Sequence, residues 1–382
     1  MTFVAPSKTP VGAGNPARSR LSRRLLRPAL LWEEPAKSRL RAGLPAPQLG
    51  SHNLWWVPRA MTTGSQATCL AKNQLLGRAG LWLLLLLTAG ALHATTYYLT
   101  VTGLGGEPDY EQHFAMWGKE IDKDLKSAPD AKVETLINAT RAQVRTALNG
   151  IAGDAKPQDV LVVMLIGHGT YDGYDYKINL PGPDLTAAEL ATLLDRIPAT
   201  RQLVVNMTSA SGGSISFLRR PNRVVITATK SGTEKNATIF ARYFVEALSD
   251  PATDTDKNDV VSALEAFHFA DKKTAAYYES EGRLATEHAV LEDTGKGDGV
   301  RAPSSENGEG LLASQFPLLR IGATAAAAKD PAKLQLIANK DAIEQQIDKL
   351  KYDKAAIPPD EYKKQLGDLL LRLARIQEEI DK

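Results

Sequence analysis

Cysteine is almost missing from this chain of 382 residues, whose one thiol belongs to Cys69. A disulfide framework needs pairs of cysteines and a thiolate metal site needs several, so neither can hold the fold together. Long apolar runs are also scarce, because the apolar block at residues 79–91 falls short of the roughly 20 residues that span a bilayer. Hydrophobic residues still make up 43% of the chain, which excludes wholesale disorder.

The small net charge of +2 hides a strong asymmetry along the chain. Residues 1–60 carry a charge of +8 and eight of the 21 prolines, whereas residues 92–382 carry −8. The first segment is therefore interpreted as a basic, Pro/Arg-rich, non-globular extension, which a true start at Met61 would remove. The acidic remainder argues against nucleic acid as a partner.

The apolar block at residues 79–91 has the layout of a secretory signal peptide. Lys72 and Arg78 precede it, and small residues close it. We interpret residues 61–94 as this leader and expect an exported protein, periplasmic or extracellular. A leader that is not cleaved and anchors the chain to a membrane is the alternative. Cys69 lies inside the leader, so the mature chain would contain no thiol.

Strand-like and helix-like patterns alternate over residues 95–322, which predicts one α/β domain. The expected strands cover residues 97–101, 133–137, 159–166, 202–207 and 224–229, with a hairpin at 174–180. The expected helices cover residues 110–126, 140–151, 186–196 and 238–248. This order predicts a doubly wound, mostly parallel sheet with helices on both faces. Ligands of such sheets bind beyond the carboxyl ends of the strands, here after Ile166, Met207 and Thr229.

The last part of the chain has a different pattern. An Ala-rich linker is expected at residues 323–330, and residues 331–382 then carry apolar residues at alternating steps of three and four. Pro358 and Pro359 interrupt this pattern, because proline breaks a helix. We therefore predict a C-terminal α-helical hairpin or coiled coil, through which the chain could associate with a second copy.

Two motifs follow the ends of two successive predicted strands. His168 stands between Gly167 and Gly169, directly after the most apolar strand, and the small neighbours allow another group to approach closely. Ser209 lies 41 residues later in a turn rich in serine and glycine, which can present a side chain and free N–H groups to an oxyanion. Each motif alone also fits an ordinary structural role, as a histidine at a strand end or as a strand-to-helix turn.

Together, the two motifs resemble the active site of caspase-like cysteine peptidases, most closely the legumain (asparaginyl endopeptidase) branch. The resemblance covers about residues 96–300 and implies a caspase-like fold and a peptide substrate. It places His168 on the catalytic histidine, Gly169 on the glycine whose N–H helps to form the oxyanion hole, and Ser209 on the nucleophilic cysteine. It also implies a substrate-binding role for Gly103, Ser211, Gly212, Ala228 and Thr229.

Three departures from the family pattern concern the chemistry. Ser209 replaces the cysteine, Met207 replaces an acidic residue, and no basic residue is evident around residues 111–112. A thiol with a pKa of about 8.5 is partly ionised at neutral pH, whereas a serine needs a base that a third group orients. We therefore expect an impaired enzyme, a pseudo-peptidase that binds peptide segments or protein partners and requires no cofactor. An active endopeptidase or hydrolase, with His168 as the base for Ser209, is the alternative.

Residues 254–265 match the ligand spacing of an EF-hand calcium loop. The candidate ligands at positions 1, 3, 5 and 12 are Asp254, Asp256, Asn258 and Glu265. Position 6, a glycine in that motif, is Asp259 here, and an acidic solvated loop before a helix is the ordinary explanation. Calcium is therefore a candidate cofactor, and a calcium-dependent scaffold is a third functional hypothesis.

Ser211 offers a further and weaker hypothesis. It lies at the centre of a sequence similar to a nucleophile elbow, for which His268 or His288 would be the base. The first glycine of that motif is missing, and His168 would then have no role.

Overall fold

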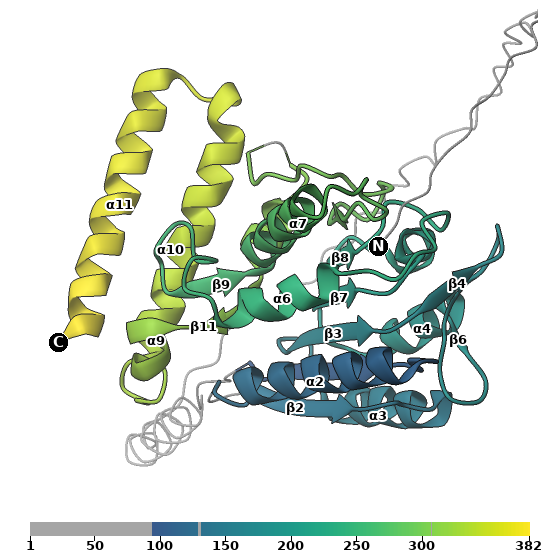
Figure 1. The fold of residues 1–382 in the computed structure, drawn as a ribbon. Coiled ribbons are helices and arrows are strands. Elements are labelled where there is room, and N and C mark those ends of the chain that lie inside the picture. The colour runs from purple at the N-terminus through teal and green to yellow at the C-terminus, as the bar shows by residue number, and fades with distance from the viewer. Residues whose placement is uncertain (1–93, 129–130, 307) are drawn as a thin grey trace, which may run out of the picture. The chain divides into compact units, whose positions relative to one another are not determined.

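A six-stranded, mostly parallel sheet forms the centre of the computed structural model, which describes residues 94–382 except 129–130 and 307 (Figure 1). Its strands are β1 (Thr96–Thr102), β2 (Ala131–Leu136), β3 (Val160–Ile166), β7 (Arg201–Asn206), β8 (Arg223–Thr227) and β10 (Val290–Glu292). They lie in the order β10-β8-β7-β3-β1-β2, and only β10 runs antiparallel to its neighbour. The prediction of a mixed α/β fold with a mostly parallel sheet is therefore confirmed.

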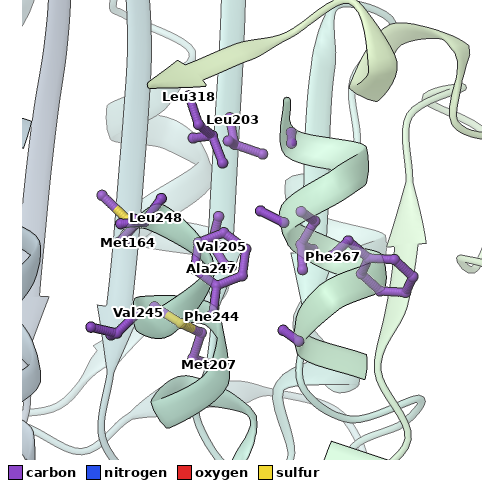
Figure 2. Packing of buried hydrophobic residues seen from close by; sticks show 14 of the residues in the cluster. Met164, Leu203, Val205, Met207, Phe244, Val245, Ala247, Leu248, Phe267 and Leu318 are labelled. Carbon is purple, nitrogen blue, oxygen red and sulfur yellow. The ribbon is translucent and has the colours of Figure 1, made fainter. Parts of the chain in front are cut away.

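Helices cover both faces of the sheet, and the side chains of each strand alternate between two cores. In β3, Val162 and Met164 belong to the core under α2 (Pro108–Leu125), α6 (Phe240–Ser249) and α7 (Ala263–Ser280). Figure 2 shows this packing, with Met164, Val205 and Met207 facing Phe244. Leu161, Val163 and Leu165 belong to the opposite core, under α3 (Arg141–Asp154), α4 (Ala187–Leu194) and α5 (Ile215–Leu218). Every residue of β3 is buried, as its unbroken apolar run predicts.

Two small antiparallel sheets accompany the main one. The first contains β4 (Gly169–Tyr171), β5 (Tyr176–Ile178) and β6 (Leu185–Thr186). β4 begins shortly after the carboxyl end of β3. The expected hairpin at residues 174–180 thus begins earlier, at residue 169. The second sheet pairs β9 (Val260–Ser262) with β11 (Pro317–Arg320), next to α8 (Leu311–Ser314). These strands are too short to produce a clear periodic signal.

The C-terminal segment consists of helices. α9 (Gly322–Ala327) occupies the stretch expected to be a linker, and α10 (Leu334–Tyr352) and α11 (Pro359–Asp381) follow it. α10 and α11 lie side by side and run antiparallel, joined by η2 (Asp353–Ala356) (Figure 1). α10 also binds the α/β domain, since Arg320 pairs with Asp341 and the buried Lys340 donates to the Asn258 carbonyl at 2.8 Å.

The basic extension and nearly all of the expected leader lie outside the described residues. Among the helices that the structure does describe, none is both long and apolar enough to cross a bilayer.

Candidate functional site

The loops that carry the two motifs meet at one edge of the sheet. β3 and β7 pair in parallel, with Leu165 opposite Asn206, so the segments that follow them leave the sheet side by side. The turn after β1 joins them, because the Gly103 N–H donates to the Ile166 carbonyl at 2.8 Å. Gly103 has no room for a side chain, since a Cβ there would lie 2.5 Å from the Asn179 carbonyl oxygen. The strand order therefore brings the segments that contain Gly103, Gly169 and Ser209 to one edge of the sheet.

His168 packs against the helix that follows β1. Its half-buried ring meets Tyr110 and Phe114 of α2 edge to face, at centroid distances of 4.8 and 5.3 Å. Burial lowers the pKa of His168 below its ordinary value, although a backbone hydrogen bond with Gly105 and the nearby Glu107 carboxylate act in the opposite direction. The neutral imidazole therefore dominates at neutral pH, which is the form that a general base requires.

Ser209 accepts a hydrogen bond from the backbone of Gly169. The Gly169 N–H donates to Ser209 Oγ at 3.2 Å, and Ser209 is only 2% exposed. Gly169 itself can carry no side chain, because a Cβ would lie 2.4 Å from the Ser209 carbonyl oxygen. Among the hydrogen bonds of the described residues, none joins His168 to Ser209. The hydrogen bond that the Ser209 hydroxyl accepts in this structure therefore comes from a backbone N–H.

A buried network of polar side chains holds the turn around Ser209 in place. Thr208 Oγ1 donates to Asn206 Oδ1 at 2.9 Å and makes a short contact with the Tyr176 hydroxyl. The Asn206 amide continues the network to Ser214 Oγ at 3.1 Å. Ala210 adopts a left-handed backbone conformation (φ 55°), which turns the chain sharply after Ser209. A local strain of this kind is typical of functional sites.

The remaining residues with an expected substrate-binding role lie next to each other but face inward. The Thr229 N–H donates to Ser211 Oγ at 3.1 Å, and the Gly212 N–H donates to Thr229 Oγ1 at 2.9 Å. Ser211, Ala228 and Thr229 have no exposed surface. The hydroxyl groups of Ser211 and Thr229 therefore join the turn after β7 to the end of β8. Among the hydrogen bonds of the described residues, none joins Ser211 to a histidine.

A histidine–carboxylate pair at the same edge has no counterpart in the predicted site. His288, just before β10, lies with Nδ1 2.5 Å from Glu234 Oε1, and the His288 N–H donates to Glu234 Oε2 at 3.1 Å. The Glu234 carbonyl accepts the Ala210 N–H at 2.8 Å. Glu234 thus fastens its own loop both to the Ser209 turn and to β10. The two residues are 54 positions apart in the sequence, so no local motif predicts the pair.

The candidate calcium ligands also come together, partly as expected. Single carboxylate oxygens of Asp254, Asp256 and Glu265 lie within 4.8 Å of one another. Asp254 accepts the N–H groups of Asn258 and Asp259 at 3.1 and 3.0 Å, which curls the loop around it. Asp259, at the position where the motif has glycine, adopts φ 63°, so the backbone makes the left-handed turn without glycine. The Asn258 side chain points instead to Asp256 and Glu344, at 3.4 Å from each.

The electrostatics of this cluster suit a cation. Burial and the adjacent Glu265 and Asp254 carboxylates raise the pKa of Asp256 to about 6. Oxygen ligands from carboxylates are those that calcium prefers. Part of the donor set is already in use, because Glu265 accepts the N–H groups of Thr255 and Ser262 at 2.8 and 3.0 Å.

Comparisons with known proteins add little to this geometry. Neither a protein-family model nor a curated protein matches the chain. Protein GSU0716 from Geobacter sulfurreducens has a solved structure with 14% identity and a TM-score of 0.34, over 47% of this chain and 89% of that one. The Drosophila initiator caspase Dronc also has 14% identity and a TM-score of 0.34, over 52% of this chain and 80% of that one. The α/β architecture therefore rests on the strand pairing described above.

Proposed function

We propose that this chain is an exported, legumain-like protein of the caspase type whose peptidase site is impaired, and that it recognises a peptide or protein segment without rapid cleavage. The observation that carries the proposal is the 3.2 Å hydrogen bond from the Gly169 N–H to Ser209 Oγ. A competent serine needs its proton taken by a base during attack on the carbonyl carbon, and its oxyanion donor must be free. Here the hydroxyl has no histidine partner and fills that donor itself.

Accessible groups around the same edge support a recognition role. The His168 ring remains half-buried, and Leu104, in the turn after β1, is 38% exposed. Tyr174, at the tip of the β4–β5 hairpin, is 87% exposed. Exposed apolar and aromatic side chains beside a polar ring are typical of segments that contact peptides.

The test uses Ser209→Cys, with Ser209→Ala as the matched control, on a diverse library of fluorogenic peptides. We expect no turnover by the wild type, slow turnover by Ser209→Cys, and none by the double variant Ser209→Cys/His168→Ala. Turnover by the wild type that Ser209→Ala removes would favour the active hydrolase instead. A folded Ser209→Cys protein that cleaves no peptide would refute the proposal that the residues around position 209 keep the arrangement of a peptidase site.

A second proposal concerns calcium. We propose that residues 254–265 bind this cation and that it stabilises the contact between the α/β domain and α10. Three converging carboxylates and the left-handed turn at Asp259 support it. The loop is also tied directly to α10, because Lys340 donates to the Asn258 carbonyl and the Asn258 amide lies 3.4 Å from Glu344. Bound calcium should therefore raise the melting temperature.

A further inference from the structure

The loop at residues 229–239, between β8 and α6, forms one wall of the turn that carries Ser209. The Glu234 carbonyl of this loop accepts the Ala210 N–H at 2.8 Å. The two backbones also touch at Gly212, because a Cβ there would lie 2.2 Å from a backbone nitrogen of the loop. The loop therefore packs directly on the residues that follow Ser209.

β4 forms the opposite wall of the turn. The Gly169 N–H of β4 donates to Ser209 Oγ at 3.2 Å, and Ser209 is only 2% exposed. The Tyr171 ring of β4 also reaches the loop, since a Cβ on Gly232 would lie 2.2 Å from that ring. Pairing with β5 holds β4 in its own sheet, whereas the loop contains no strand. The position of the loop therefore depends on its side-chain contacts.

The contact that fastens the loop to the segment before β10 is the pair of Glu234 and His288. Glu234 Oε1 lies 2.5 Å from His288 Nδ1, and Glu234 Oε2 accepts the His288 N–H at 3.1 Å. The two side chains are 11% and 24% exposed, so water screens the pair only in part. Lys230 Nζ, at 3.6 Å from Glu234 Oε1, is a second partner and is more exposed. Hydrogen bonds to a carboxylate are stronger than those between neutral groups.

We propose that Glu234 and His288 act together as positioning residues of the candidate peptide site. Their pair holds residues 229–239 against the turn and thereby keeps residue 209 closed to solvent and in contact with Gly169. The inference rests on the proposed function only for its role in peptide recognition. Among the hydrogen bonds of the described residues, none joins either side chain to Ser209, so the pair acts through the loop.

The test measures how accessible a thiol at position 209 is. The parent protein is the full chain with Ser209→Cys and Cys69→Ser, whose single thiol is alkylated with iodoacetamide. We expect His288→Ala in this parent to raise the alkylation rate by about tenfold or more, because loss of a partly buried, charge-assisted contact increases the population of the open loop. Glu234→Ala should do the same. The double variant should react no faster than the faster single variant, since both changes remove one contact.

Two control variants and a second measurement separate positioning from general stability. His288→Asn keeps an N–H donor near the Nδ1 position and should restore the slow alkylation of the parent. His268→Ala, which changes an exposed histidine of α7, should leave the rate unchanged. Amide hydrogen exchange supplies the second measurement. In His288→Ala, the Ala210 N–H should exchange faster while the amides of β3 keep their protection.

An alkylation rate that His288→Ala leaves unchanged would overturn the proposal. So would a failure of His288→Asn to restore the parent rate, additive effects of the two alanine changes, or an equal loss of protection in β3. None of these measurements requires turnover of a peptide. A parent protein that cleaves no peptide would therefore contradict the proposed function, whereas the alkylation rates alone decide this inference.

Discussion

Glu287 is a buried carboxyl group whose ionisation should set much of the pH dependence of stability. It is 4% exposed and lies just before β10. It accepts hydrogen bonds from the N–H groups of Ile239 and Phe240, at the start of α6, and from the Tyr278 hydroxyl at 3.0 Å. Burial raises the pKa of Glu287 to about 7, despite these donors, and the nearby Glu234 carboxylate raises it further.

The sign and size of the effect follow from this shift. A carboxyl whose pKa is raised in the folded state contributes stability that is complete below its unfolded pKa, near 4.5, and is lost as the pH rises through about 7. The difference between 4.5 and about 7 corresponds to about 3 kcal/mol, at about 1.36 kcal/mol per pKa unit. Glu287→Gln keeps an acceptor for the α6 N–H groups and removes the charge. The variant should therefore gain about 3 kcal/mol relative to the wild type between about pH 4.5 and 8.5.

Urea unfolding at several pH values measures this difference directly. Asp256 and Glu344 also have raised pKa values, of about 6 and about 7, but both remain in the variant and cancel in the comparison. Glu279→Gln, an exposed change on α7, is the control and should show almost no pH-dependent difference. The prediction compares the free energy of unfolding of Glu287→Gln with that of the wild type. A difference between the two that does not change with pH would refute it.

Two further predictions concern the site and the calcium loop. Gly169→Ala should destabilise the fold by about 1–3 kcal/mol, because its Cβ would lie 2.4 Å from the Ser209 carbonyl oxygen and 2.7 Å from the Tyr176 ring. Gly150→Ala, in α3 with nothing near its Cβ, should be neutral or stabilising, and equal effects in urea unfolding would contradict the close approach. Calcium should raise the melting temperature of the wild type at pH 7.5 but not that of Asp254→Asn, with magnesium much less effective. A wild type that does not respond to calcium would remove the cation proposal.

The sequence predicted the sheet because apolar runs dominate its strands. β3 is buried on both faces in the interior of the sheet, as its unbroken run of apolar residues indicated. Since carboxyl ends of adjacent parallel strands share an edge, the meeting of the segments after β3 and β7 could be predicted as well. Patterns of this kind indicate which residues are buried and which strands lie in the interior of the sheet.

The hydrogen bonds of the site could not be predicted in the same way. Ser209 Oγ binds the Gly169 N–H because a left-handed residue, Ala210, sets the direction of the turn, and alanine gives no sequence signal for that conformation. Likewise, β10 has three residues, and it brings His288 to Glu234 through antiparallel pairing with β8. Such contacts depend on tertiary geometry that no local pattern encodes.

Serine at position 209 would suit the proposed impaired site for a physical reason. The Gly169 N–H is part-buried at the start of β4, and a fully buried donor without a partner costs about 1–3 kcal/mol, an upper bound here. The Ser209 hydroxyl satisfies that donor without a ligand, whereas a sulfur atom is a weak acceptor and would leave it poorly satisfied. If the Gly169 N–H is the proposed oxyanion donor, a cysteine at position 209 would keep this donor available at a cost in stability. A serine there would remove the cost and would also block the donor. Ser209→Cys should consequently lose stability in the same experiment in which it gains reactivity, and a variant that is reactive yet more stable would contradict this link.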